Sequence, residues 1–326
     1  MTFATGGRFS NYPQGFAYGI SVRGIPLLQC QPGQVYWLNN STVLNPGQKP
    51  GSDGNSGTFL APFATLNYAA SRCVAGRGDI IMVGTGHAES ITSATALTIA
   101  NSGTAVIGLG AGDLRPTFTL TTATTATINI KAADVSFQNC VFLGGFLNIA
   151  ALFTLTAANN FAVDNCEIRD SSSTLTILNV IATDATANHA DGLALTRNLI
   201  ISKSAAGAVT LLAPGANQDR WRIEDNTYIA ATTAANAAMV LGAHVMTAFR
   251  VINNNWYLTN ATGTATGYLI TTSASTDTGI VQGNIDRALP STPLLCTTGS
   301  GLSFGFGNYH SDAADTQGYL VPAADS

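Results

Sequence analysis

The sequence predicts an all-β protein built as a parallel β-helix, a solenoid of short strands wound into stacked coils. Three observations carry this prediction. The 326-residue chain is 46% hydrophobic but only 10% charged, whereas about 25% of the residues of an average globular protein are charged. It holds three lysines and three glutamates, and because these residues normally cover helix surfaces, a mainly helical protein is excluded. A short sequence phrase, in which apolar and polar residues alternate before an asparagine, also recurs along the C-terminal two-thirds of the chain.

In each copy of the recurring phrase, apolar and polar residues alternate, an asparagine follows, and a second β-rich stretch begins. FAVDNCEIR and WRIEDNTYI are two copies. The phrases are 24 to 33 residues apart and centre on Asn139, Asn165, Asn198, Asn226, Asn254, Asn284 and Asn308. Such an interval holds three short strands and their turns without a helix. Because one unit cannot bury its own apolar face, the units are predicted to stack on one another.

The recurring asparagine is predicted to have a structural role. Each strand of a parallel β-helix pairs with the equivalent strand one coil away, at about 4.8 Å, so equivalent residues form columns. Asparagines in one corner column can hydrogen-bond to one another as a ladder, whereas a buried amide without partners costs about 1–3 kcal/mol. Cys140 and Cys166 each follow one of these asparagines, and we expect them to be stacked free thiols one coil apart rather than a disulfide.

Upstream of the repeat, residues 51–90 are predicted to cap the open end of the solenoid. Pro62 is expected in the first turn of a short helix. An apolar stripe at helical spacing supports that helix: Phe63, Leu66, Ala69, Ala70 and Cys73. Gly76 and Gly78 are expected to end the helix, and residues 79–83 are predicted to form a strand. The cap would cover the unpaired strand edges of the first coil.

The segments GSDGNSGT, PFATL and GDIIMVGTGHAE of this block resemble the opening of the pectate-lyase-like superfamily of right-handed parallel β-helices. The later phrase IEDNTYI is similar to the repeat of that superfamily, so the resemblance covers about residues 35–310. It implies a single-stranded right-handed β-helix with a short N-terminal capping helix. His87 stands where the superfamily usually has tyrosine. The fold hosts lyases, hydrolases, adhesins and viral spikes, so the resemblance implies no particular activity.

We expect four segments along the chain. Residues 1–50 would be a lead-in or attachment segment, and residues 51–90 the capping turn, the helix and the first coil. Residues 91–310 would form the β-helix, and residues 311–326 a C-terminal tail. The sequence shows neither a signal peptide nor an apolar run long enough to span a membrane, so we expect no membrane partner.

The cap, the Ala- and Thr-rich solenoid and the scarcity of lysine resemble virion proteins of tailed bacteriophages, whose β-helix subunits usually form trimers. This resemblance implies a homotrimer made in the host cytoplasm. We expect a capsid decoration or cement protein on the phage head, with the major capsid protein or other virion proteins as partners. The net charge of −4 predicts no nucleic-acid partner. Two alternatives stay open: a tailspike-type receptor-binding protein or polysaccharide depolymerase, and a bacterial surface adhesin.

A glycosidase on this fold would need two carboxylates that face one groove. Asp164 and Asp225 each precede a repeat asparagine, which predicts one column and a separation of about 9.6 Å, close to the upper limit for inverting enzymes. Arg197 takes the same place in the coil between them. A neighbouring arginine lowers a carboxyl pKa, whereas a general acid needs a raised one. We therefore predict a salt ladder, no catalytic residue, and a protein that is not an enzyme.

The other notable polar residues have structural interpretations, with one cluster that allows two. Glu167 and Arg169 alternate to the same outward side and predict a solvated face. The Asp53-x-Asn55 turn is similar to half of a calcium loop, but we assign it to the cap. The histidines lack the spacing of a metal site, so no metal and no cofactor are expected. The densest charge cluster predicts either a binding surface or an ion-pair patch between subunits: Asp219, Arg220, Arg222, Glu224 and Asp225.

Overall fold

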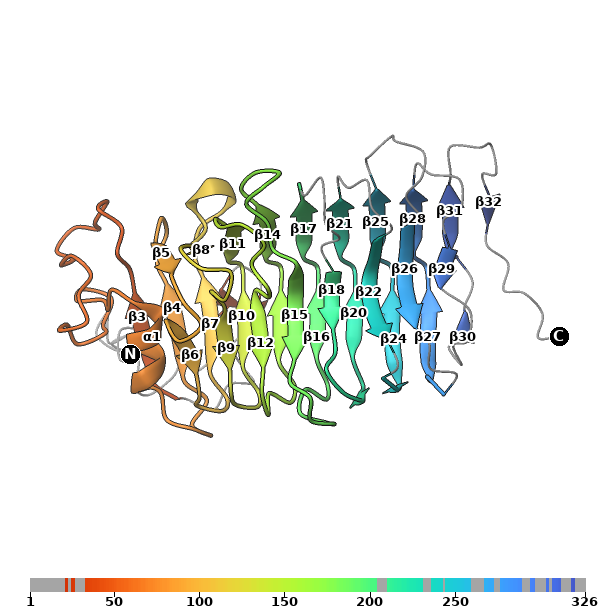
Figure 1. Ribbon diagram of the computed structural model, residues 1–326. Helices are drawn as coiled ribbons and strands as arrows, with labels where there is room; N and C mark the ends of the chain where they lie inside the picture. Colours follow the sequence, from red (N-terminus) through yellow and green to blue (C-terminus); the bar gives the residue numbers. More distant parts are fainter. Residues whose placement is uncertain are drawn as a thin grey trace, which may run out of the picture.

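The computed structural model is an elongated solenoid that runs from a helical cap at the N-terminal end to short strands at the C-terminal end (Figure 1). The described residues are 33–203, 210–230, 236–242, 244–258, 267–272, 276–288 and 307–311, with the short segments 21–22, 25–26, 294–296, 303–304 and 318–319. These residues form eight complete coils, and each coil contributes one strand to each of three long sheets. The predicted right-handed parallel β-helix with an N-terminal capping helix is confirmed.

Sheet 1 is entirely parallel and contains ten strands. In spatial order these are β3 (Val35–Leu38), β4 (Ile80–Val83), β7 (Ala105–Gly108), β10 (Ser136–Gln138), β13 (Ala162–Asp164), β16 (Ala194–Thr196), β20 (Arg222–Glu224), β24 (Phe249–Ile252), β27 (Gly279–Gln282) and β30 (Ser303–Phe304). Most of these strands are three or four residues long, so one or two side chains per strand face the core and their neighbours face outward.

Sheet 2 also contains ten strands, of which the last pairs antiparallel. They are β5 (Ala88–Ile91), β8 (Thr117–Leu120), β11 (Val141–Gly144), β14 (Glu167–Asp170), β17 (Leu199–Ser202), β21 (Thr227–Ala230), β25 (Asn255–Leu258), β28 (Ile285–Ala288), β31 (Tyr309–Ser311) and β32 (Gly318–Tyr319). Each strand from β5 to β31 follows a strand of sheet 1 after a turn of only a few residues, which makes the tight corner where the repeat asparagines lie.

Sheet 3 closes each coil with eight parallel strands. They are β6 (Leu97–Ile99), β9 (Ile128–Ile130), β12 (Phe153–Leu155), β15 (Asn179–Thr183), β18 (Thr210–Ala213), β22 (Asn236–Gly242), β26 (Gly267–Thr272) and β29 (Leu294–Cys296). Four shorter strands form two separate pairs: β1 (Ser21–Val22) with β2 (Ile25–Pro26), and β19 (Gln218–Asp219) with β23 (Met246–Thr247). One 3-10 helix covers Gly112–Leu114.

The N-terminal cap is built around α1 (Leu66–Arg72). The Thr65 hydroxyl accepts a hydrogen bond from the Tyr68 N–H as the N-cap. Asp53 accepts from the Thr65 N–H at 3.0 Å and from its hydroxyl at 2.7 Å, which gives this aspartate the predicted role in the cap turn. The helix begins later than predicted because Asp53 and Thr65 fix its start, so Pro62 and Phe63 lie before it.

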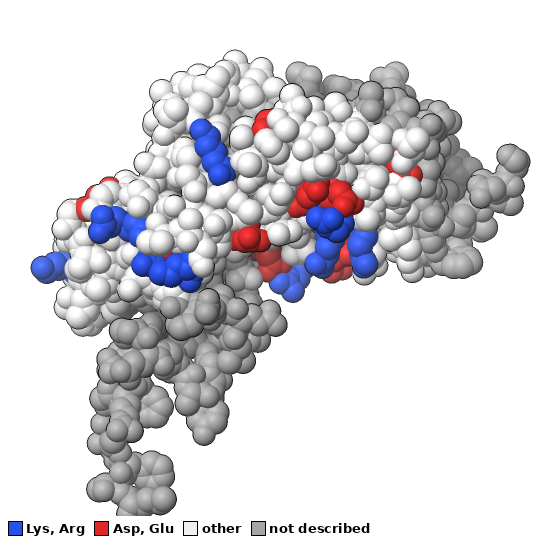
Figure 2. All heavy atoms as spheres, turned by 90° about the horizontal axis from the view of Figure 1, so that it is seen from below, with Lys and Arg blue, Asp and Glu red and all other residues white. Residues whose placement is uncertain are grey.

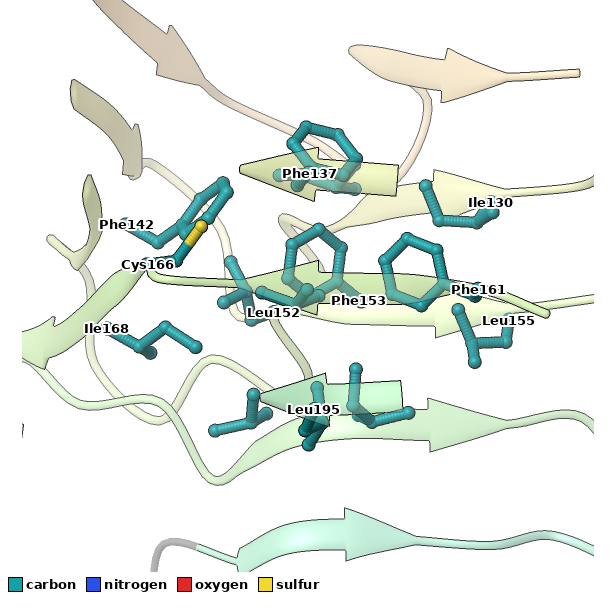
Figure 3. Close-up of a cluster of buried hydrophobic side chains, with 14 of the residues drawn as sticks. Ile130, Phe137, Phe142, Leu152, Phe153, Leu155, Phe161, Cys166, Ile168 and Leu195 are labelled. Carbon is teal, nitrogen blue, oxygen red and sulfur yellow. The ribbon is translucent and has the colours of Figure 1, made fainter. Parts of the chain in front are cut away.

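The core is a continuous column of inward-facing apolar side chains, with an aromatic cluster midway along it (Figure 3). Phe153 of β12 is fully buried there. Its ring centroid lies 5.3 Å from that of Phe137, 5.1 Å from that of Phe142 and 5.1 Å from that of Phe161. These contacts come from strands of all three sheets and from the turn before β13, so the cluster holds the sheets together.

The asparagine ladder exists, and it occupies the corner between sheets 1 and 2. Its members in the described part of the chain are Asn198, Asn226, Asn254, Asn284 and Asn308, all buried. The Asn226 Oδ1 accepts hydrogen bonds from the Asn198 N–H at 2.9 Å and from its Nδ2 at 3.0 Å. The same contacts recur from Asn226 to Asn254 and along the rest of the file. The recurring asparagine is therefore architectural, as predicted.

The prediction was wrong by one residue in the first two phrases. Asn139 and Asn165 precede the ladder column and adopt left-handed backbone angles, with φ of 55° and 50°. The ladder column itself holds Cys140 and Cys166 in these coils, and the Cys140 N–H donates to the Cys166 Sγ at 3.4 Å. Asparagine is common in the left-handed region as well as in ladders. The same residue type therefore marks two adjacent positions of the corner.

The two cysteines are free and buried, one coil apart, as predicted. The Cys166 N–H donates to the Asn198 Oδ1 at 2.9 Å, so the sulfur atoms continue the file of asparagine side chains. A hydrogen bond with the Cys166 thiol, together with burial, raises the pKa of the Cys140 thiol well above its ordinary value. The Cys140 thiol therefore stays protonated, and both buried cysteines serve as small apolar residues.

Candidate functional site

The outward-facing residues of sheet 1 change character along the solenoid. On the first coils they are apolar and buried, as at Ile80, Met82 and Ile107. Midway along, acidic and basic side chains gather next to one another on one face, whereas the other basic side chains in the same view lie apart from this group (Figure 2). We call this group the charged face; it consists of Asp164, Asp191, Arg197, Asp219, Arg220, Arg222, Glu224 and Arg250.

Asp164, at the end of β13, is the most heavily bonded carboxylate of the charged face. It accepts from the Arg197 Nε at 3.0 Å, from the Thr196 hydroxyl at 2.7 Å and from the Gln138 Nε2 at 2.8 Å. Burial raises its pKa, but the hydrogen bonds and the charge of Arg197 outweigh burial, so the pKa of Asp164 is lower than usual. Asp164 is therefore ionised at neutral pH.

Glu224, at the end of β20, is held by two arginines from adjacent coils. Its Oε2 accepts from the Arg222 Nη2 at 2.8 Å, and its Oε1 accepts from the Arg250 Nε at 3.0 Å. The hydrogen bond from Arg222, the charges of both arginines and the hydrogen bond from Arg250 lower the pKa of Glu224, against the opposing effect of burial. Ionised carboxylates can stabilise charge or accept a proton, but they cannot serve as the general acid of a glycosidase.

A third ion-pair group lies in the turn that leads into sheet 1. The Arg220 Nη1 donates to the Asp219 Oδ2 at 2.6 Å, and its Nη2 lies 3.9 Å from the Asp191 Oδ2. The Asp219 N–H donates to the Asp191 Oδ1 at 2.8 Å, and the Thr247 hydroxyl donates to the Asp219 Oδ1 at 2.6 Å. These bonds hold two carboxylates of successive coils next to each other, with one guanidinium between them.

The charged face presents guanidinium groups to solvent and keeps its carboxylates beneath them. The side chains of its four arginines are 53–61% exposed, whereas those of its four carboxylates are 14–26% exposed. The formal charges of the eight side chains cancel. Planar groups that are already held by ion pairs lose little rotamer freedom on binding, and the arginines keep unused N–H donors. This surface therefore suits a neutral ligand rich in hydroxyl groups.

The predicted column of Asp164, Arg197 and Asp225 is wrong. Asp164 pairs across the sheet with Thr196, and Thr196 pairs with Glu224. Arg197 and Asp225 lie one position later, at the left-handed turn that Asn139 and Asn165 also occupy. The ion pair between Arg197 and Asp164 exists, but it runs diagonally between columns. The cause is the same as for the shift of the ladder: the asparagines of the first two phrases stand one residue earlier in the coil than those of the later phrases.

One further prediction is corrected on sheet 2. Glu167 and Arg169 do point to the same outward side, as the alternation indicates, but Glu167 is buried rather than solvated. It bonds to the Arg115 Nη2 and to the Arg169 Nη1, the latter at 2.9 Å. Asp170 points inward, where its Oδ1 accepts from the Ile177 N–H at 2.8 Å and its Oδ2 accepts from the Lys203 N–H at 2.9 Å.

Sequence reasoning missed two members of the charged face, Asp191 and Arg250. A signal for Arg250 was present: WRIEDN and FRVINN place Arg222 and Arg250 at the same point of their phrases, and the two residues pair directly. Asp191 lies in a turn without a repeated phrase, and its position follows only from the register of the coils. Of the predicted charge cluster, Asp219, Arg220, Arg222 and Glu224 are brought together with the residues around Asp164.

Neither a metal centre nor a membrane-spanning helix is found in the part of the chain that the structure describes. No group of three or more His, Cys, Asp or Glu side chains there is arranged to hold a metal ion. None of the described helices has the length and apolar character needed to cross a bilayer. His87 instead has a place in the cap, where its Nδ1 accepts from the Asn40 N–H at 3.1 Å and its Nε2 lies 3.2 Å from the Glu89 Oε2.

We expect the ion pairs of Asp164 to stabilise the fold in a pH-dependent way. Because the folded pKa is lower than the unfolded one, the stabilisation is present above about pH 4 and is lost as the pH falls through the folded pKa. Asp164→Asn should therefore unfold more readily than the unmodified protein at pH 7, and the difference should be smaller at pH 2. Denaturant unfolding at both pH values measures this. An equal difference at pH 7 and pH 2 would contradict it.

The fold class rests on the structure itself, because the comparisons with known proteins add no argument to it. No family model matches the chain, and no curated protein matches it. A solved structure, that of a rhamnogalacturonan lyase, matches with a TM-score of 0.45 and 12% identity over 89% of this chain and 90% of that one. The class that the fold and the site define is a parallel β-helix with a polar, ion-paired outer face.

The expectation that the chain is not an enzyme is corrected by this comparison. The matched protein is an enzyme, so membership of the β-helix class gives no ground for excluding catalysis, and the expectation is withdrawn. At 12% identity and a TM-score of 0.45, the likeness carries no argument about a substrate, a reaction or a particular residue of this chain. These must come from the charged face itself.

Proposed function

We propose that the protein is a polysaccharide-binding β-helix protein of the tailspike type and that the charged face of sheet 1 is its binding surface. The observation that carries the proposal is the layering of this face, with exposed guanidinium groups held over carboxylates. Sugar hydroxyls both donate and accept hydrogen bonds, so arginine donors and carboxylate acceptors at adjacent positions are complementary to them. The balanced charge favours a neutral glycan over a polyanion.

The geometry of the sheet supports binding of an extended chain rather than of a single sugar. Arg222 and Arg250 lie at equivalent positions of adjacent coils, and Gln138, Asp164, Thr196 and Glu224 form one column along the solenoid axis. Equivalent polar groups thus repeat at about 4.8 Å. A polymer that lies along the axis would meet one such row of groups after another.

Binding is expected to depend on the arginines of the face. We would measure affinity for immobilised dextran, mannan and polygalacturonate, with binding expected to a neutral polymer. Arg222→Ala with Arg250→Ala should weaken that binding at least tenfold, because buried arginine contacts commonly dominate binding energy. Arg72→Ala, an exposed arginine at the end of α1, is the matched control and should bind normally.

Two results would contradict the proposal: binding to none of these polymers, or the same loss of affinity in the control and in the double variant. Release of new reducing ends from the bound polymer would establish that the protein also cleaves it. That assay is run on the same samples, since catalysis is no longer excluded.

A place on a phage particle is part of the same proposal and rests on the resemblance of composition and cap. A receptor-binding protein would be found at the tail. The head surface, with the major capsid protein as partner, is the second candidate location. The outer column of sheet 3 favours this location, because its small side chains can pack closely against another protein. The column consists of Thr98, Asn129, Thr154, Ala182 and Ala213. Cryo-electron microscopy of purified phage particles would show whether the protein lies on the tail or on the head. If the particles lack the protein at both places, its proposed location on a phage particle is wrong.

A further inference from the structure

The outward side chains of sheet 1 are apolar on its first three strands, β3, β4 and β7. They form two rows in direct register across these strands. We call the six residues of the two rows the first-coil face: Val35, Ile80, Ala105, Trp37, Met82 and Ile107. The rows continue into Ser136 and Gln138 of β10, where the apolar character ends. Soluble proteins rarely leave a continuous apolar surface uncovered, so this face is expected to have a partner.

The middle of the first-coil face is buried although it points away from the core. Ile80 and Met82 are each 6% exposed, and Ile107 is 7% exposed. In the row of Ile80, the smaller side chains of Ser136 and Ala162 are more exposed. A larger side chain reaches further from the same sheet surface, so it should be the more exposed one unless something lies over it. A further part of the protein therefore covers the first coils but not the coils of β10 and β13.

The described apolar side chains that contact this face stand beside it rather than over it. Leu109 follows β7 and extends the face at the end of that strand. Phe59 contacts Trp37 edge to face, with ring centroids 5.0 Å apart. Residues 57–63 lie along the free edge of β3, opposite β4, where the Trp37 N–H donates to the Gly57 carbonyl at 2.8 Å. Phe59 therefore widens the face beyond β3 and leaves the cover of β4 and β7 to be explained.

We propose that residues 1–32 are this cover and pack on the first-coil face. They enter β3 directly beside the face, because Gln34 is bonded into the start of the sheet. The Gln34 N–H donates to the Asp79 Oδ1 at 2.7 Å, and the Ile80 N–H donates to the Gln34 carbonyl at 3.0 Å. The segment therefore joins the described solenoid next to Ile80, whose burial requires a cover.

The composition and the length of residues 1–32 suit this position. The segment contains two arginines and no other charged residue, and it is rich in aromatic residues: Phe3, Phe9, Tyr12, Phe16 and Tyr18. An extended chain advances about 3.3 Å per residue, and three adjacent strands span about 10 Å. A stretch of only a few residues would thus cross the face. This inference concerns the N-terminal end of sheet 1 and does not depend on polysaccharide binding.

Thiol labelling of the full chain tests whether the face is covered. Ile80→Cys should react with a maleimide at least tenfold more slowly than Ser136→Cys, which stands in the same row two coils further on. Peptide mass spectrometry separates the new cysteine from the five native ones, and circular dichroism establishes that both variants are folded. Equal labelling rates in the two folded variants would overturn the proposal.

Photo-cross-linking of the otherwise unchanged protein identifies the cover. Photo-methionine, which carries a diazirine, is incorporated in place of methionine, including Met82 in the face and Met246 in the core. Illumination should link the Met82 peptide to peptides from residues 1–32, and Met246 is the positive control that should link to other core residues. Links from Met82 only to residues after position 32, or no link from Met82 while Met246 reacts, would overturn the proposal. In a mixture of isotopically light and heavy chains, links from Met82 between light and heavy peptides would identify a second copy as the occupant and would overturn it as well.

Discussion

Asn226→Ala is expected to lower the free energy of unfolding by about 3–5 kcal/mol. The Asn226 side chain accepts from the N–H and the Nδ2 of Asn198, and it donates to the Leu195 carbonyl at 2.8 Å and to the Asn254 Oδ1 at 3.0 Å. All of these groups lie in a buried corner where water cannot replace the lost partner. Each polar group left without a partner costs about 1–3 kcal/mol, so the loss exceeds that of an ordinary surface substitution.

Asn253→Gly is the matched control for this prediction. Asn253 stands one residue before the ladder, is exposed and has a left-handed φ of 55°. The next two coils already hold Gly283 and Gly307 in this column, and glycine adopts such angles without strain. The control should change the free energy of unfolding by less than about 0.5 kcal/mol. Chemical denaturation measures both variants, and similar values for the two would show that the ladder is not a major source of stability.

The second large effect is expected in the aromatic cluster. Phe153→Ala removes a fully buried ring that contacts three other phenylalanines. Truncation of a buried phenylalanine costs about 3–5 kcal/mol, through lost transfer energy and the cavity that remains. Because the cluster joins all three sheets, we expect the whole described solenoid to unfold at lower denaturant rather than one coil alone.

Phe153→Leu and Leu114→Ala are the controls: they distinguish the loss of core packing at Phe153 from the effect of shortening an apolar side chain elsewhere in the protein. The leucine variant keeps most of the apolar volume and should cost less than half as much as the alanine variant. Leu114 is 62% exposed, so its truncation should change the free energy of unfolding by less than about 0.5 kcal/mol. Thermal and denaturant unfolding measure all three. A loss below about 1 kcal/mol for Phe153→Ala would contradict the position given to this ring.

Much of the fold could be predicted because its physical causes are local. Alternation in phrases such as WRIEDN decides which side chains face the core, and the interval between phrases sets the length of one coil. Asp53 and the apolar stripe of the cap also lie within a short stretch. The start of α1 was predicted too early, since Pro62 suits a first helical turn, and the contacts that fix the N-cap come from Asp53, twelve residues before Thr65.

The candidate site was harder to predict because it depends on register between coils. Asn139 and Asn198 look equivalent in sequence, yet one takes a left-handed turn and the other joins the ladder. A shift of one residue moves Asp164 from the column of Asp225 to that of Glu224 and changes its partners. Ion pairs such as Glu224 with Arg250 join residues 26 positions apart, and only the alignment of the repeated phrases WRIEDN and FRVINN indicates such a pair.

A crystal structure at a resolution that places side-chain amides tests the central claim most directly. The account predicts Asn198, Asn226, Asn254, Asn284 and Asn308 in one file at the corner of sheets 1 and 2, with the Asn226 Oδ1 about 3.0 Å from the Asn198 Nδ2. It also predicts Cys140 and Cys166 in the same file and Asn139 and Asn165 outside it. Ladder asparagines on different sides of the molecule, or side chains of the file turned toward solvent, would contradict the account.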